Sequence, residues 1–218
     1  MNYLKIIGEI IKLRPPDKPK IVQYHVNAYS LVRRIKKILD YSNKSDKIFF
    51  IGDDDFTSLI LYKLGYKHLT VIDIDEEILN LIKTYSKSNI NTIQFDLRKV
   101  YKGKYPFLKE KYDLFITDPS YTKDGIRIFI MSGLINLKKN GVGIIMLPYK
   151  YKGDMRWAKL KFIEEFLIRN NLLILEIIPN CQKYYHGTKS SIVIIKNMTK
   201  QKDNKFKIKK LFGYKHFY

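Results

Sequence analysis

The chain has 218 residues, of which 45% are hydrophobic and 14% aromatic, enough for one sizeable core and too few for two comfortable domains. Its single cysteine, Cys181, excludes an internal disulfide framework and a cluster of thiolate metal ligands, which predicts a protein of a reducing, cytoplasmic compartment. Lys and Arg number 41 against 21 Asp and Glu, a formal net charge of +20, so either anionic partners are favoured or the composition is simply rich in Lys.

Residues 1–46 are predicted to form a helical entry segment. Residues 1–13 alternate at roughly helical spacing until three prolines within residues 14–19 interrupt the pattern. Residues 29–39 predict an amphipathic helix, with Leu31, Ile35, Ile38 and Leu39 on one face and Arg33, Arg34, Lys36 and Lys37 mostly off it. No apolar run approaches the roughly 20 residues that cross a bilayer, so no membrane partner is expected.

From residue 47 onward, short β-branched runs alternate with helical stretches. Strands are predicted at 48–52, 69–75, 92–96, 113–118 and 142–148, and helices at 57–64, 76–87, 125–137 and 156–170. Two strands without a helix between them, 172–179 and 190–196, predict an antiparallel hairpin at the sheet edge. This α/β order looks like the seven-stranded, mostly parallel Rossmann-like fold of S-adenosylmethionine-dependent transferases. We expect a catalytic domain over 47–197 and a basic tail over 198–218, which has seven Lys against one Asp.

Acidic residues follow four consecutive predicted strands. In doubly wound sheets the ligand lies beyond the carboxyl ends of the strands, so these residues predict the walls of a pocket. One Asp after a strand is also an ordinary helix cap, and capping is the alternative reading at each position. The strand ends are Gly52-Asp53-Asp54-Asp55, Asp73 with Asp75, Asp96 and Asp118.

Asp73 and Asp96 are predicted to contact an adenosine cofactor. Asp73 lies 21 positions after Gly52, near the roughly 20-residue spacing at which a Rossmann acidic residue meets ribose hydroxyls. Asp75 and the two Glu after it already supply the next helix with acidic groups, so capping does not require Asp73. Asp96 closes the third strand, where a carboxylate can accept from an adenine amino group.

The turn from Gly52 to Asp55 favours a cationic ligand. It has one glycine where the G-x-G-x-x-G pattern has three, and three carboxylates would repel a pyrophosphate. They suit a sulfonium centre and an ammonium group, which indicates an S-adenosyl compound with Gly52 and Asp53 beside it. A divalent metal on the same carboxylates is the competing interpretation, and we expect no metal.

The turn Asp118-Pro119-Ser120-Tyr121 is predicted to hold the acceptor. Pro119 restricts the backbone so that the Asp118 carboxylate faces the cleft, where it can orient an amine and accept its proton. Tyr121 can cover an extended or planar substrate. His186, in the loop between the last two strands, is a candidate base or substrate contact, and an ordinary turn residue otherwise.

Four stretches together resemble the branched-chain polyamine synthases: GDDDFTS from Gly52, VIDIDE from Val71, FDLRK from Phe95 and DLFITDPSYT from Asp113. The resemblance covers about residues 14–148. It implies a catalytic domain without the winged-helix domain that precedes it in that family. It also implies transfer of an aminopropyl group from decarboxylated S-adenosylmethionine to a polyamine, with Asp53, Asp54, Asp55 and Asp118 forming the donor and amine sites. Two departures leave the acceptor open: Ser120 stands where a second proline is usual, and the C-terminal segment is basic.

Two functions follow from these residues. In the first, Asp54 or Asp55 holds the donor's ammonium, Asp118 holds the acceptor nitrogen of a polyamine, and Tyr121 lines the channel, with no metal. In the second, S-adenosylmethionine supplies a methyl group to an exocyclic amine of DNA or RNA, because the Asp118 turn also resembles the Asp-Pro-Pro-Tyr turn of amino-group methyltransferases. The basic tail and the basic helix would then hold phosphates of the nucleic acid. The sequence leaves monomer and homodimer both open.

Overall fold

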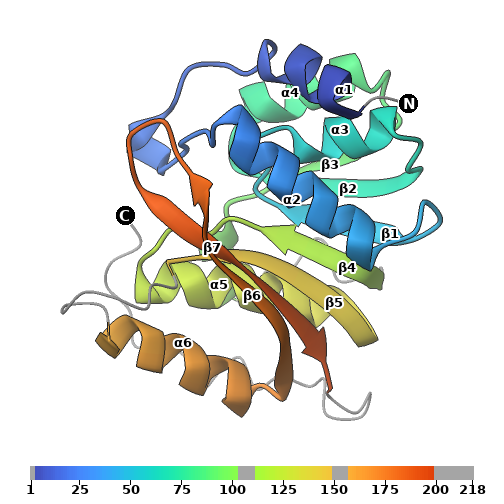
Figure 1. Cartoon of the computed structure of the whole chain (residues 1–218). Helices are drawn as coiled ribbons and strands as arrows, with labels where there is room; N and C mark the ends of the chain where they lie inside the picture. Colours follow the sequence, from blue (N-terminus) through green and yellow to red (C-terminus); the bar gives the residue numbers. More distant parts are fainter. Residues whose placement is uncertain (1–2, 103–110, 149–156, 199–218) are drawn as a thin grey trace.

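The computed structural model describes residues 3–102, 111–148 and 157–198, which form a seven-stranded sheet with helices on both faces (Figure 1). The strands are β1 (Lys47–Ile51), β2 (His68–Asp73), β3 (Asn91–Gln94), β4 (Tyr112–Thr117), β5 (Leu137–Leu147), β6 (Leu172–Lys183) and β7 (Lys189–Asn197). The helices are α1 (Tyr3–Ile11), α2 (Ala28–Tyr41), α3 (Thr57–Lys63), α4 (Glu76–Tyr85), α5 (Lys123–Asn136) and α6 (Trp157–Arg169), with short 3-10 turns η1 (Pro19–Ile21) and η2 (Leu97–Lys102).

The strand order is β3-β2-β1-β4-β5-β7-β6. The first five strands of that order are parallel, and β7 is antiparallel to both β5 and β6. The predicted mostly parallel sheet with a C-terminal antiparallel hairpin is therefore confirmed. The order reverses between β1 and β4, and at such a switch point the loops after the two strands diverge and leave a crevice for a ligand.

Side chains alternate between two hydrophobic cores because successive residues of a strand point to opposite faces. In β1, Ile48 and Phe50 join a core beneath α1, α2, α3 and α4, whereas Phe49 and Ile51 join a core beneath α5 and α6. All four side chains are fully buried. Burial on both faces explains why the strand is a continuous apolar run rather than an alternating one.

The entry segment packs into the first of these cores. Ile6, Ile7 and Ile10 of α1 are buried with Leu31 of α2. Asn27 caps α2, accepting a hydrogen bond from the Ser30 amide at 2.9 Å. The chain between α1 and α2 crosses the carboxyl ends of the strands (Figure 1), where Lys18 forms an ion pair with Asp75 at 2.5 Å.

Two strands are longer than predicted. β5 begins at Leu137 and includes the polar residues 138–140. Leu137 pairs with Tyr112 of β4, and the register then shifts before Val142 pairs with Leu114. β6 continues past Pro179 to Lys183, with a second irregularity between Ile178 and Gln182. β6 lies at the sheet edge, where a proline removes no required ladder hydrogen bond. None of the helices in the described ranges is both long and apolar enough to span a membrane.

Candidate active site

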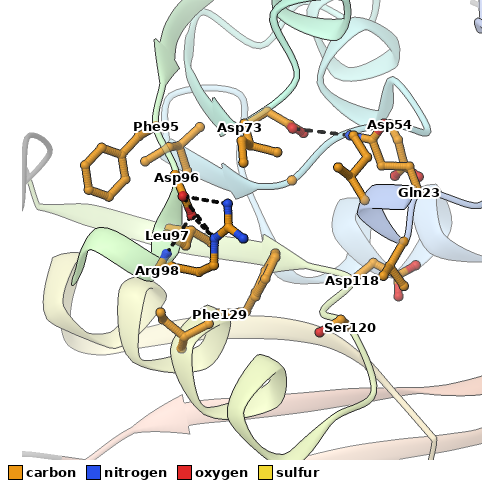
Figure 2. A pocket seen from close by; sticks show the side chains of 16 residues that line it. Gln23, Asp54, Asp73, Phe95, Asp96, Leu97, Arg98, Asp118, Ser120 and Phe129 are labelled. Carbon is orange, nitrogen blue, oxygen red and sulfur yellow. Dashed lines mark hydrogen bonds and ion pairs between the residues drawn. The ribbon is translucent and has the colours of Figure 1, made fainter. Parts of the chain in front are cut away.

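The ends of three adjacent strands bring the acidic turns together. Ile51 of β1 is in register with Ile72 of β2 on one side and Thr117 of β4 on the other. The residues that follow these positions therefore meet at one edge of the sheet, and Figure 2 shows Asp54, Asp73 and Asp118 around one cleft there. The expected grouping of carboxylates is present in the structure.

Gly52 and Asp53 build the first turn. Gly52 has φ +75°, a left-handed conformation that favours glycine, and its amide donates to the Ile72 carbonyl at 2.9 Å. The Asp53 carboxylate accepts from the Thr57 amide at 2.8 Å and the Ser58 amide at 3.0 Å, so it caps α3. Burial raises the pKa of Asp53 to about 7, against these hydrogen bonds. Asp53 lies behind the cleft rather than on its surface.

Asp55 is buried and neutralised by two arginines. Its carboxylate lies 3.0 Å from Arg14 Nη2 and 2.9 Å from Arg34 Nη1, and it accepts the Val26 amide at 3.1 Å. Neither of the two clefts at this edge of the sheet is lined by Asp55. Because both of its oxygens already have cationic partners, we retain Asp54, and not Asp55, as the candidate contact for a donor's ammonium.

Asp54 differs from Asp53 and Asp55 in its contacts. It is half-buried, and within the described ranges it makes no hydrogen bond or ion pair. Burial, followed by the charges of Asp55, Asp118 and Asp73, raises its pKa well above the ordinary value, while Arg34 opposes that rise. An unpartnered carboxylate in this setting is stabilised by any cation that enters the cleft.

Asp118 lies at the centre of a hydrogen-bond network. Its oxygens accept from Arg34 Nη2 at 2.8 Å, from the Tyr184 hydroxyl at 2.7 Å and from the Tyr121 hydroxyl at 3.2 Å. The two tyrosine hydroxyls lie 2.6 Å apart, and that of Tyr184 also lies 3.1 Å from Ser190 Oγ. Burial raises the pKa of Asp118, against the lowering effect of Arg34 and the Tyr184 hydrogen bond. Tyr121, which was predicted only to cover the substrate, thus bonds to Asp118, and Tyr184 adds a second hydroxyl.

The turn that contains Asp118 is held by the start of α5. Thr122 caps this helix, accepting from the Gly125 amide at 2.9 Å. A Cβ on Gly125 would lie 1.9 Å from Ser120 Oγ and 2.6 Å from the Ser120 carbonyl oxygen. The absence of a side chain at Gly125 therefore allows the turn to fold against the helix.

The first cleft is open to solvent, and the space between its walls, solvent included, is about 720 Å³. Apolar side chains, including Phe95, Leu97 and Phe129, form part of its wall (Figure 2). Asp73 accepts hydrogen bonds from the Asp75 amide at 2.9 Å, the Asp53 amide at 3.2 Å and Gln23 Nε2 at 3.3 Å, and burial raises its pKa to about 6. Asp96 forms an ion pair with Arg98 at 2.8 Å. Polar groups and an apolar wall in one cleft are the composition of a small-molecule site.

The second cleft, of about 560 Å³, shares four lining residues with the first: Val22, Asp54, Asp118 and Ser120. The rest of its wall is largely aromatic, with Tyr24, Tyr121, Tyr184 and His186. The rings of Tyr24 and His186 lie 4.2 Å apart, and His186 is exposed at the rim. The two clefts are therefore contiguous, and Asp54 and Asp118 lie at their junction.

Four contributing residues were absent from the sequence-based site: Arg14, Tyr24, Arg34 and Tyr184. Arg34 corrects an expectation, because it was assigned to the polar face of its helix and is only 2% exposed. It follows Leu31 by three positions and precedes Ile38 by four, so the helical period places it in the buried stripe. Lys37, another member of the expected phosphate-binding face, lies 2.9 Å from Glu176. Of the predicted basic tail of residues 198–218, residues 199–218 lie outside the described residues.

The sequence is similar to that of a known family of enzymes. The family model described as the branched-chain polyamine synthase A C-terminal domain matches residues 2–215. An N(4)-bis(aminopropyl)spermidine synthase of Methanocaldococcus jannaschii is 31% identical over 192 residues, which cover 84% of this chain and 53% of that protein. An uncharacterized protein of the same organism is 37% identical over 158 residues, covering 70% of this chain and 37% of its own length. The chain thus spans about half or less of these relatives.

A solved structure shares the fold. The branched-chain polyamine synthase of Thermus thermophilus, determined with N4-aminopropylspermidine and 5'-methylthioadenosine, superimposes with a TM-score of 0.79 at 19% identity. The match covers 90% of this chain and 63% of that one. The predicted transferase-like α/β fold is confirmed.

Proposed function

The chain belongs to the branched-chain polyamine synthase family, and from that premise we propose that it transfers an aminopropyl group from decarboxylated S-adenosylmethionine to an amine of a polyamine. The observation that carries the proposal is Asp54, an unpartnered carboxylate at the junction of a nucleoside-like cleft and an aromatic one. The decarboxylated donor has a sulfonium and an ammonium, and a single carboxylate without a competing cation suits that ammonium.

The first cleft fits the adenosine part of the donor. Asp73 is the proposed ligand of the ribose hydroxyls, since its carboxylate faces the cleft from the end of β2. Phe95, Leu97 and Phe129 offer apolar surface for the adenine ring, and Asp96 is the proposed acceptor for its amino group. The carboxylate of S-adenosylmethionine itself would be repelled by Asp54.

The second cleft fits an amine. Asp118 is the proposed hydrogen-bond acceptor for the nitrogen of the acceptor amine, and Tyr121, Tyr184 and Tyr24, which line the same cleft, are the proposed ring faces for ammonium groups elsewhere in a polyamine. His186 is the proposed contact at the rim. The local cluster of carboxylates outweighs the net charge of +20 at contact distance, because salt screens the more distant lysines over about 10 Å.

The proposed reaction is a direct displacement. The acceptor nitrogen bonds to the carbon of the aminopropyl chain that is attached to sulfur, while the bond between that carbon and sulfur breaks. The bonding pair stays on sulfur and gives neutral 5'-methylthioadenosine. A nitrogen that attacks as the free base keeps its proton in the ammonium product, so charge balances. Asp54 and Asp118 contribute by holding the two reactants in line, an effect that can supply several kcal/mol.

The test is the structure of the product. The protein is incubated with decarboxylated S-adenosylmethionine and spermidine, and the product is analysed by mass spectrometry and NMR. We expect a tetra-amine bearing the new aminopropyl group on the internal nitrogen, with one 5'-methylthioadenosine per transfer, and loss of both products in Asp118→Asn. Complete recovery of unreacted spermidine from the wild-type reaction would sink the proposal. A product extended at a terminal nitrogen would retain aminopropyl transfer and exclude the branched product.

A further inference from the structure

Arg34 forms an ion pair with each of the two acidic turns. Its Nη1 lies 2.9 Å from Asp55 after β1, its Nη2 lies 2.8 Å from Asp118 after β4, and its Nε donates to Gln182 Oε1 at 3.0 Å. Gln182 is itself fully buried and donates to the Ser30 carbonyl at 2.9 Å. Arg34 is thus fixed by three partners from three elements, in a planar fork that lysine cannot reproduce.

We propose that Arg34 is a positioning residue that cancels the charge of Asp118, so that the acceptor nitrogen binds beside a neutral ion pair and reacts as the free base. The inference rests on the proposed function. A nitrogen needs its lone pair to displace sulfur, whereas an unpaired carboxylate within about 4–6 Å would hold the same nitrogen as an ammonium. Arg34 removes that difficulty at Asp118 and leaves the neighbouring Asp54 free to bind a cation.

The division of charge between the two turns follows from their contacts. Asp54 and Asp118 line both clefts, yet only Asp118 has a guanidinium and two hydroxyls within hydrogen-bond distance. We therefore assign Asp54 to the sulfonium and the ammonium of the donor. Asp118, whose negative charge is cancelled by Arg34, orients an N–H of the acceptor. A proton that the acceptor brings into the second cleft leaves to solvent, since that cleft is open.

Other ionisable side chains lie near Arg34 and the two acidic turns. From the strand ends these are Asp54, Asp55 and Asp73, and the hydroxyls of Tyr121 and Tyr184 bond to Asp118 directly. From the entry segment and the hairpin come Tyr24, His25 and His186. His25 lies 3.8 Å from Asp55 and 3.7 Å from Asp17. His186 lines the second cleft, so its contribution has to be separated from that of Arg34.

The experiment measures kcat at saturating donor and acceptor against pH, because this profile reports the groups of the bound complex. It compares wild type, Arg34→Gln and Arg34→Lys, with Arg33→Gln as the matched control. Arg33 is exposed on the same helix and contacts Tyr29. We expect the acidic limb of the Arg34→Gln profile to move to higher pH by about 1–2 units, which lowers activity about 10–100-fold at the foot of the limb and much less above it. Arg34→Lys keeps the charge, so its limb should stay near that of wild type although kcat falls.

Controls make each outcome decisive. The shift should persist in the His186→Gln background. The double variant Arg34→Gln/Asp55→Asn replaces the single variant if the latter does not fold, because it also removes one of the two carboxylates that lose a cationic partner. A kcat that falls equally at every pH, with an unmoved limb in a folded variant, would overturn the role of Arg34 and leave aminopropyl transfer intact. A wild-type protein without any transfer would overturn the proposed function and this inference together.

Discussion

Replacement of Asp54 by Asn is expected to weaken binding of the donor and to stabilise the fold. The substitution keeps the size of the side chain and removes one charge. Asp54 is half-buried among Asp55, Asp73 and Asp118 and has no partner in the described ranges. An unpartnered carboxylate of this kind costs about 1 kcal/mol of folding free energy, so we expect the Tm of Asp54→Asn to rise by about 2–4 °C.

The effect on binding has the opposite sign. A charge-assisted hydrogen bond to the donor's ammonium contributes about 1.5–3 kcal/mol, so the Kd for decarboxylated S-adenosylmethionine should rise about 10–100-fold. The neutral 5'-methylthioadenosine has no ammonium, and its Kd should stay within about threefold. Calorimetric titration of both ligands into wild type and variant measures the difference directly. Glu9→Gln, an exposed change on α1, is the matched control for loss of one negative charge.

Two results would refute this reasoning. Equal weakening of both ligands would mean that Asp54 shapes the cleft and does not contact the ammonium. Unchanged binding of both ligands would mean that the donor's charge is held elsewhere. In either case the assignment of Asp54 would be lost, whatever the activity of the variant.

Three further changes test other parts of the site. Asp73→Asn should raise the Kd of 5'-methylthioadenosine and of the decarboxylated donor equally, about tenfold. A calorimetric titration in which the Kd of only one of the two ligands rises would contradict the role of Asp73 at the ribose. The pKa values of Asp53 and Asp73 are raised to about 7 and about 6 in the folded state. The folded chain therefore binds protons that the unfolded chain does not bind above pH 4. From pH 8 to pH 5.5 the free energy of unfolding should rise by about 2–3 kcal/mol, and Tm should rise by about 5–10 °C. Asp53→Asn should show a smaller rise by calorimetry, and an identical rise would refute the assignment. Gly125→Ala places a Cβ 1.9 Å from Ser120 Oγ, so we expect a loss of about 1–3 kcal/mol in denaturant unfolding together with lower activity, and wild-type behaviour in both would show that the turn adjusts freely.

The sheet could be predicted because its signal is local. The strands are short β-branched runs buried on both faces, and the helices between them have their own apolar stripes and caps, as at Asn27 and Asp75. The aspartates at the strand ends were predictable for the same reason, since parallel strands bring their carboxyl ends to one edge. The lengths of β5 and β6 were less predictable, because polar residues and Pro179 are tolerated where pairing is irregular or at an edge.

The pairing of charges within the site could not be predicted, because the partners lie far apart in the sequence. Arg14 is 41 positions from Asp55, Arg34 is 84 positions from Asp118, and Tyr184 is 66 positions from Asp118. Nothing in the local pattern distinguishes an aspartate that caps a helix from one that faces a ligand. The three adjacent carboxylates of the first turn thus looked alike in sequence, although in the structure one is a cap, one is free and one is paired.

The most direct test of the account is a competition between donors in one reaction. The protein is supplied with spermidine and equal amounts of S-adenosylmethionine and its decarboxylated form, and the amine products are separated by mass. If the enzyme transfers aminopropyl groups, the amine products gain an aminopropyl group, 5'-methylthioadenosine is released, and S-adenosylmethionine is recovered unchanged. Methylated amine with release of S-adenosylhomocysteine would contradict aminopropyl transfer, and would mean that the carboxylate at Asp54 does not select the donor.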